Sequence, residues 1–462
     1  MNRRTFAQLS GCFLAGLVVA SCDSRLSSTQ GGDSVTRLAN NEPLQIWWQE
    51  GFYPEETDAL TQIIADWESE TGSTVELSVI PQKDILQEVE QALVAGEPPD
   101  ILYSGAADIT IIPKLAWDNV LADVSEVVGT QAERYSEKAL TSVSYQNKAV
   151  GDRSYYAVPL MQSAIHIHYW EDMLINLVGE RRDTIPQQWE DFWQFWLTAQ
   201  RALDDGEVSD TYSIGMPMSL SLDTYNNFEQ FLEAYDVNVL SETGELRVDA
   251  PDVRQKLVNA LEDYARFYEA EAVPPESVDW DNTGNNVSLL SRNSLMTVNH
   301  TLSGPGSQRN DADIYYDRLA TIKWPDKPNG DPMRFVIEIK QAVVFAASEN
   351  KDAAKSFLTH LTQPENLATY TEGSQGRYLP VMPELFEDPF WQDARDTHIS
   401  VAVEQLENTR PAYQAFNPAY GEVAAQNVWG NTMRKIALEN MPIEVAADQA
   451  IADIQQIFAE WQ

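Results

Sequence analysis

The sequence predicts an α/β protein of two lobes, each a mostly parallel sheet flanked by helices, joined by a hinge of several chain segments. Residues 44–103 alternate strand-like and amphipathic helix-like segments, an order typical of a parallel, doubly wound sheet. A further strand-like segment, residues 163–170, follows Pro159, and we interpret this stretch as a crossing into a second lobe. The length of 462 residues is sufficient for two or three domains.

The first lobe is predicted from the periodicity of its apolar residues. Residues 44–48 form an apolar strand, residues 73–80 alternate in hydrophobicity as a second strand, and residues 100–103 form a third. Two amphipathic helices lie between these strands, and each ends at a glycine, which is favoured just after a helix. Because parallel strands end at the same edge of a sheet, we expect residues 48–53 and 103–108 to face a shared crevice.

The second lobe contains a predicted helix, residues 188–203, with aromatic side chains along one face. Aromatic residues at helical spacing are more typical of a core than of a ligand site. These residues are Trp189, Phe192, Trp193 and Trp196. Another amphipathic helix covers residues 251–270, and a strand covers residues 294–301. The predicted boundaries place residues 44–155 and 314–363 in the first lobe, and residues 156–313 and 364–462 in the second.

The N-terminus has the pattern of a targeting segment. Arg3 and Arg4 precede an apolar stretch that ends in small residues before Cys22. This ending resembles the bacterial lipobox, and the arginine pair resembles a twin-arginine export signal, with the general secretory route as the alternative. We therefore predict a signal peptide over residues 1–21, lipidation at Cys22 and a polar, flexible tether over residues 22–43. An uncleaved N-terminal anchor is the alternative interpretation.

The charge balance restricts the classes of partner. The chain has 71 Asp and Glu residues against 31 Lys and Arg, a formal net charge of −40. Nucleic acids and anionic lipid surfaces would repel such a chain, so neither is expected as a partner. Beyond the N-terminus no apolar run reaches the roughly 18 residues that a membrane span needs. Any attachment to a membrane is therefore expected through the lipid anchor alone.

Several short motifs occur in the order found in one family. They are Pro98-Pro99-Asp100, Tyr156-Ala157-Val158-Pro159, Pro186 with Trp189, Val273-Pro274-Pro275 with Trp280-Asp281, Met296-Thr297-Val298-Asn299, Ala353-Ala354 with Phe357-Leu358, and Tyr378-Leu379-Pro380. This series resembles family 1 of the extracellular solute-binding proteins, the sugar-binding lipoproteins of ABC importers. The resemblance covers nearly all of residues 44–460 and implies a periplasmic-binding-protein fold that holds its solute between the lobes. Where the family often has Gly-Gly-Trp, this chain has Glu338-Ile339-Lys340, so the resemblance does not name the solute.

Candidate binding residues lie at strand ends and in loops. Sugars need flat apolar surfaces for their C–H faces and polar groups for their hydroxyls. Residues 47–53 supply both, and Trp280, which lies outside any periodic element, is predicted as a stacking platform. The predicted substrate-binding residues are Trp48, Gln49, Glu50, Tyr53, Ser104, Asp108, Gln162, Tyr225, Trp280, Asp281, Asn299, Glu338, Gly376 and Arg377.

Catalytic and metal motifs do not stand out in the sequence. His166 and His168 point to the same side of a strand, but no third ligand accompanies them, so we interpret them as hydrogen-bonded core residues. The sequence has no Gly-x-Ser-x-Gly elbow and no P-loop. We therefore predict that the protein is not an enzyme and uses no cofactor or metal.

The resemblance implies a function. We expect a monomeric lipoprotein on the outer face of the cytoplasmic membrane, in the periplasm. It would capture a neutral sugar, an oligosaccharide or a glycoside osmolyte, such as glucosylglycerol, sucrose or trehalose, and deliver it to an ABC permease. A surface glycoside hydrolase and a sensory solute-binding lipoprotein are the alternative functions.

Overall fold

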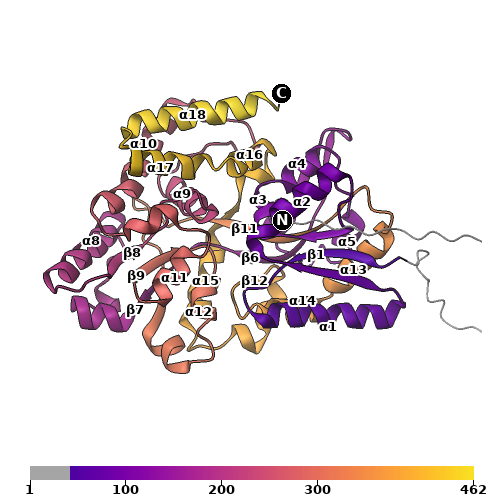
Figure 1. Cartoon of the computed structure of the whole chain (residues 1–462), viewed down its shortest axis with the longest axis horizontal. Helices are drawn as coiled ribbons and strands as arrows, with labels where there is room; N and C mark the ends of the chain where they lie inside the picture. The colour runs from indigo at the N-terminus through magenta and orange to yellow at the C-terminus, as the bar shows by residue number, and fades with distance from the viewer. Residues whose placement is uncertain (1–41, 462) are drawn as a thin grey trace, which may run out of the picture. The chain divides into compact units, whose positions relative to one another are not determined.

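Two separate β-sheets with helices packed on them form the framework of the computed structural model, which describes residues 42–461 (Figure 1). The predicted signal peptide, Cys22 and all but the end of the predicted tether lie outside the described residues. Over residues 42–461, no helix combines the length and the hydrophobicity that crossing a membrane requires.

The larger sheet defines what we call the first lobe. Its strand order is β12-β6-β11-β3-β1-β2, and β13 pairs with β11. β1 is parallel to β2 and β3, whereas β11 is antiparallel to β3 and β6. The strands are β1 (Leu44–Gln49), β2 (Val75–Ile80), β3 (Ile101–Tyr103), β6 (Val158–Ser163), β11 (Phe335–Val344), β12 (Leu379–Pro380) and β13 (Thr409–Pro411). A hairpin of β4 (Ser144–Asn147) and β5 (Asp152–Tyr155) stands beside it.

The smaller sheet defines the second lobe. Its order is β10-β7-β9-β8, in which β7 is antiparallel to both of its neighbours and β8 is parallel to β9. The strands are β7 (His166–Trp170), β8 (Tyr212–Gly215), β9 (Ser294–Asn299) and β10 (Leu319–Ile322).

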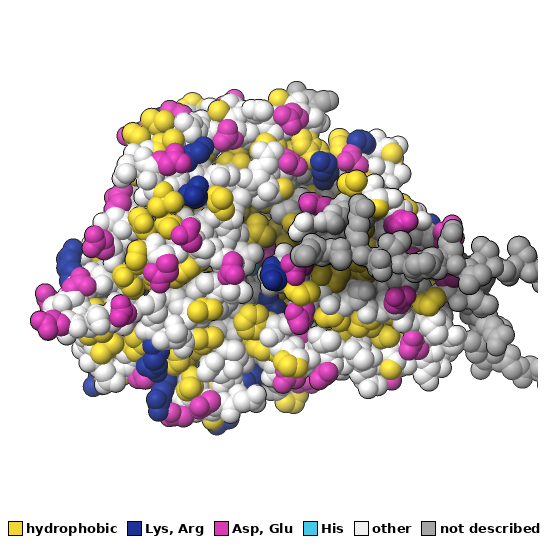
Figure 2. Space-filling model, in the orientation of Figure 1, with side chains coloured by type: hydrophobic (Ala, Val, Ile, Leu, Met, Phe, Trp, Pro, Cys, Tyr) yellow, Lys and Arg dark blue, Asp and Glu magenta, His cyan; other side chains and the backbone are white. Residues whose placement is uncertain are grey.

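Helices flank both sheets. In and beside the first lobe are α1 (Pro54–Thr71), α2 (Gln82–Ala95), α3 (Gly105–Ile109), α4 (Ile112–Trp117), α5 (Ser125–Gly129), α6 (Glu137–Val143), α13 (Lys351–Leu361) and α14 (Pro364–Gly373). The remaining helices are α7 (Glu171–Met173), α8 (Trp189–Asp205), α9 (Leu222–Ala234), α10 (Pro251–Glu269), α11 (Gly284–Leu290), α12 (Ser303–Gly306), α15 (Thr397–Gln405), α16 (Ala419–Ala425), α17 (Val428–Glu439) and α18 (Ile443–Ala459). Acidic side chains are spread over the face of the molecule in Figure 2, in keeping with the net charge.

Each lobe has its own hydrophobic core. The first contains Trp67 and Phe357, and the second contains the aromatic face of α8 together with Phe231 and Phe267. The interpretation of that α8 face as core is confirmed, because its side chains are buried and pack on one another. Two cores of this kind allow each lobe to keep its structure while the segments between them adjust.

Two predictions about the lobes need correction. The sheets are mixed rather than mostly parallel, because β6 and β11 run between the lobes and enter the first sheet antiparallel to their neighbours. The sheets also divide the chain at other residues than predicted: β6 belongs to the first lobe, β10 belongs to the second, and residues 364–385 pack in the first core. Short apolar segments form equally good strands in either sheet, so periodicity alone does not assign them to a lobe.

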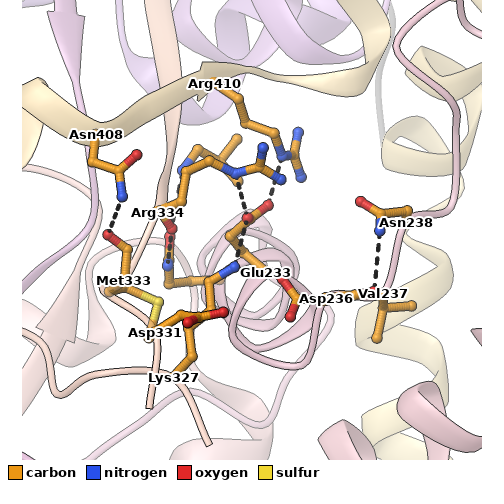
Figure 3. A network of polar contacts seen from close by, with 12 residues as sticks. Glu233, Asp236, Val237, Asn238, Lys327, Asp331, Met333, Arg334, Asn408 and Arg410 are labelled. Carbon is orange, nitrogen blue, oxygen red and sulfur yellow. Dashed lines mark hydrogen bonds and ion pairs between the residues drawn. The ribbon is translucent and has the colours of Figure 1, made fainter. Parts of the chain in front are cut away.

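A network of buried charges joins segments near these crossings (Figure 3). The Glu233 carboxylate, on α9, accepts hydrogen bonds from Arg334 Nε at 2.6 Å and from Arg410 Nε at 2.7 Å. Lys327 Nζ lies 3.4 Å from the same carboxylate and 2.6 Å from Asp236. Arg334 precedes β11 and Arg410 lies in β13, so one carboxylate of the second lobe holds two segments that enter the first sheet.

Candidate functional site

A cavity of about 70 Å³ lies between the two lobes. The first lobe lines it with Gln49, Phe52, Gln82, Gly105, Ala106, Ile109, Glu338, Lys340, Arg377 and Tyr378, and the second lobe with Leu222, Asp223, Asn226, Asn282, Thr283, Asn286, Asn299, His300, Thr301 and Ser303. Two cavities of about 20 Å³ share Ile109 and Glu338 with it. Glu338 therefore stands where three cavities meet.

The first-lobe wall is built at the ends of β1 and β3. Gln49 is the last residue of β1, and its Oε1 accepts a hydrogen bond from the backbone N–H of Gly105 at 2.9 Å. The two strands are parallel and paired, so their ends meet at one edge, as the sequence predicted. A Cβ on Gly105 would lie 3.5 Å from Lys340 Nζ, an ordinary contact distance, so this cation lies close to the start of α3.

A buried ion pair from β11 faces the cavity. Lys340 Nζ donates to Glu338 Oε2 at 2.7 Å, and both side chains point the same way because they are two residues apart on a strand. Burial would raise the pKa of Glu338, but His300 and Lys340 hold it below its usual value. Burial lowers the pKa of His300, whose Nδ1 lies 3.5 Å from Glu338. The cavity thus presents a carboxylate, an ammonium group and an imidazole.

A second buried cation stands between two aromatic rings. The guanidinium of Arg377 lies 4.6 Å from the ring centre of Tyr378 and 5.1 Å from that of Phe52. Its NH1 lies 3.6 Å from Glu56 Oε1, and its Nε makes no hydrogen bond to the described residues. Burial raises the pKa of Glu56, and Arg377 opposes that shift. Phe52 and Tyr378 give the cavity flat apolar faces, and Arg377 places its guanidinium between them.

The second-lobe wall is a set of amide and hydroxyl groups with one carboxyl. Asn299 Nδ2 donates to Asn286 Oδ1 at 2.7 Å, and Ser303 Oγ donates to the same oxygen at 3.1 Å. Asp223 lies in the first turn of α9, and its backbone N–H donates to Asn282 Oδ1 at 3.3 Å. Burial raises the pKa of Asp223 to about 7, and the charges of Glu338 and Asp281 add to this effect.

Four of the predicted site residues line this cavity: Gln49, Asn299, Glu338 and Arg377. Asp108 and Tyr225 line the two smaller cavities. Burial is the largest cause that raises the pKa of Asp108 well above its usual value.

Three predicted residues lie behind the cavity wall. Trp48 is a core residue: its ring centre lies 4.5 Å from that of Tyr103, and its Nε1 donates to the Tyr370 hydroxyl at 2.8 Å. Ser104 caps α3 by accepting from the N–H of Ala107, and the amide of Gln162 donates to a backbone carbonyl. The polar groups of Ser104 and Gln162 bond to the backbone, and that of Trp48 bonds to a tyrosine side chain.

The other predicted residues also lie outside the cavity lining. Glu50 and Asp281 are exposed, Gly376 adopts a left-handed φ of 78° in a turn, and Tyr53 is buried against the second lobe. Trp280 is half-buried and packs on Gly284, where a Cβ would lie 2.4 Å from the indole. Trp280 does not line this cavity: it packs on its own loop, whereas Asn282, two residues later, reaches the lining.

Of the twenty lining residues, sixteen were absent from the predicted set; among these, the aromatic, charged and polar side chains next to predicted residues include Phe52, Asp223, Asn226, His300, Lys340 and Tyr378. Each is a direct neighbour, or nearly so, of a residue that the sequence did indicate. Lys340 lies in a strand and points the same way as Glu338, two residues before it. The other five lie in α9 or in loops, where the strand pattern does not indicate which neighbouring side chain reaches the cavity.

Comparison with known proteins identifies the family. Residues 62–398 match the profile described as bacterial extracellular solute-binding protein, so the chain belongs to this family and the family prediction is confirmed. The chain is 25% identical over 215 residues to YcjN of Escherichia coli K12, named as an ABC transporter periplasmic-binding protein. It is 28% identical over 189 residues to the diacetylchitobiose binding protein DasA of Streptomyces coelicolor. These matches cover 44% and 40% of this chain, and 44% and 41% of the curated relatives, less than half of their length.

Solved structures share the fold over nearly the whole chain. An ABC transporter solute-binding protein of Thermotoga lettingae bound to α-D-tagatose has a TM-score of 0.74 at 17% identity, over 90% of this chain and 99% of that one. UgpB of Mycobacterium tuberculosis in complex with glycerophosphocholine has a TM-score of 0.71 at 18% identity, over 91% of this chain and 100% of that one. The similarity confirms the two-lobed periplasmic-binding-protein fold.

Proposed function

We propose that the protein is the solute receptor of an ABC importer and holds a small, neutral, hydroxyl-rich solute between its lobes. The observation that carries this proposal is the cavity itself, which paired charges and aromatic faces line between the lobes. The names of its relatives include sugar-binding proteins of ABC transporters, which supports a sugar as the solute class.

The charges of the cavity favour a neutral solute. Lys340 is paired with Glu338, and Arg377 is next to Glu56, so neither cation requires an anionic ligand. An anionic solute would lose its hydration and find each of these cations already engaged, which is costly in a buried site. Hydroxyl groups can donate to carboxylates and accept from Lys340, Arg377 and the asparagine amides, so a sugar satisfies both kinds of group.

The size of the cavity favours a small sugar. A volume of about 70 Å³ corresponds to roughly five to seven water molecules, the space of about one sugar ring. The cavities of about 20 Å³ are the size of one or two waters. We therefore favour a monosaccharide or a small glycoside, such as glucosylglycerol, over sucrose, trehalose or a longer oligosaccharide.

The location and partners are part of the proposal. The lipobox-like residues before Cys22 and the polar stretch after it support an exported lipoprotein that is tethered to the outer face of the cytoplasmic membrane. We propose that it works there as a monomer and presents its solute to the membrane subunits of the permease.

A thermal-shift screen against neutral monosaccharides, disaccharides, small glycosides, polyols and amino acids tests the proposal. A solute at about 100 times its Kd should add roughly 2.7 kcal/mol to the free energy of unfolding, because it binds only the folded state. We expect the largest rise in melting temperature with a single-ring sugar or small glycoside. A screen in which only amino acids raise the melting temperature would contradict the proposed solute class.

Solute affinity should depend on pH through Asp223. Its pKa of about 7 means that the carboxyl is protonated in acid and ionised above neutrality. A sugar hydroxyl that donates to the carboxylate binds the ionised form better, so affinity should rise between pH 6 and pH 8. Calorimetric titrations should show this slope in the wild type and lose it in Asp223→Asn. The same slope in both proteins would show that another group titrates.

A further inference from the structure

Tyr53 connects the two lobes at the edge of the cavity. Its hydroxyl donates a hydrogen bond to the backbone carbonyl of Ser303 at 2.7 Å. Tyr53 immediately precedes α1, which packs on α14 in the first lobe. Ser303 is held in the second lobe through Asn286, which accepts from its hydroxyl. The bond therefore joins a first-lobe helix to the second-lobe wall of the cavity.

The contact is also a close steric fit. A Cβ on Gly306 would lie 2.5 Å from the Tyr53 hydroxyl oxygen, so the tyrosine is seated directly on the glycine. Gly304, in the same short helix, is different: a Cβ there would lie 3.5 Å from its nearest neighbours, an ordinary contact. The need for glycine is thus specific to the position that faces Tyr53.

Two further bonds run beside this contact. The backbone N–H of Leu302 donates to the carbonyl of Arg377 at 3.2 Å, and Arg309 Nε donates to the carbonyl of Gln375 at 2.9 Å. Ser303 and Arg377 themselves line the cavity. The residues that close this edge are therefore continuous with those that would touch a solute.

We propose that Tyr53 is a positioning residue that holds the lobes closed over the cavity through Ser303 and Gly306, without touching the solute. The proposal rests on the proposed function in one respect, that the lobes separate to admit a solute. Closed and open forms differ in free energy by the contacts present only in the closed form, so weakening this contact shifts the population toward the open form.

Small-angle X-ray scattering of the full-length protein without added sugar tests this proposal. In Gly306→Ala the added methyl group and the Tyr53 ring cannot keep their present separation, so the radius of gyration should increase. In the matched control Gly304→Ala it should equal that of the wild type. A folded Gly306→Ala protein with an unchanged radius of gyration would overturn the proposal. Because no sugar is present, that failure would leave the proposed solute class standing.

A milder variant covers the case in which Gly306→Ala does not fold. Tyr53→Phe keeps the ring and removes one hydrogen bond, which should speed hydrogen exchange at the Leu302 amide roughly 2- to 10-fold. Tyr135→Phe is the control, because the hydroxyl of Tyr135 is buried in the first lobe and makes no hydrogen bond to any of residues 42–461. Equal exchange at Leu302 in the wild type and Tyr53→Phe would show that the bond does not hold the lobes together.

Discussion

The Glu233→Gln variant is expected to lose about 3–5 kcal/mol of the free energy of unfolding, because removing one partner of a buried charge network leaves its cations uncompensated. Glu233 is buried and bonded to Arg334 and Arg410. Burial would raise its pKa, yet these arginines lower it to about 2 from 4.5. A shift of that size corresponds to about 3 kcal/mol, which agrees with the expected loss. Urea unfolding at pH 7 measures it.

The pH dependence of this loss follows from the sign of the shift. A carboxylate with a lowered pKa stabilises the fold fully above its ordinary pKa, and the contribution disappears as pH falls through the lowered value. The difference between wild type and Glu233→Gln should therefore shrink between pH 4.5 and pH 2. Glu384→Gln, in an exposed pair with Arg134, is the control and should change stability by less than about 1 kcal/mol. Equal losses in both variants would show that the network is not stabilising.

The Lys340→Met variant should lose a similar amount of stability, about 3–5 kcal/mol at pH 8, because it leaves the Glu338 carboxylate buried without its ammonium partner. The loss should be smaller at pH 5. Glu338 raises the pKa of His300 and Lys340 lowers it, so without the lysine the imidazole can take up a proton and pair with Glu338. Denaturant unfolding at the two pH values measures this difference.

The same variant should bind the solute at least about 10-fold more weakly, because it removes a donor from the cavity lining. Lys323→Met is a matched control, since Lys323 forms an exposed pair with Glu404 and does not line the cavity. It should keep both stability and affinity within experimental error. A stable Lys340→Met protein with wild-type affinity would place the solute elsewhere.

The fold was largely predictable because its local signals agree with one another. Periodicity located β1, β2 and β3 and the helices between them, and the aromatic face of α8 was correctly interpreted as core. Pro159 is the instructive exception. It lies inside β6, although proline is found mainly at edge strands, first strand positions or bulges. The pairing of β6 with β11 shifts register between Lys340 and Gln341, and this irregularity accommodates the missing N–H of the proline. Such a shift depends on a distant strand, so the local sequence pattern does not predict it.

The site was predictable by segment but less well by side chain. The residues around Gln49, Asn299 and Glu338 do meet between the lobes, as parallel strand ends and the family motifs indicated. Trp48 and Trp280 were selected for their large rings. The side chain of Trp48 points into the core of the first lobe, and the ring of Trp280 packs on Gly284 in its own loop. Lys340 and Tyr378 reach the cavity because distant segments, β11 and the turn before β12, meet there.

The central claim is that the solute lies in the cavity between the lobes. The solute affinities of two single variants, Phe52→Ala and Trp280→Ala, test it most directly. Phe52 lines the cavity and is 37% exposed, so Phe52→Ala should fold normally. Loss of its ring face should weaken binding by about 1–2 kcal/mol, roughly 5- to 30-fold in calorimetric titration. Trp280→Ala, outside the cavity lining, should bind as the wild type does. Normal binding by Phe52→Ala together with weakened binding by Trp280→Ala would contradict the account.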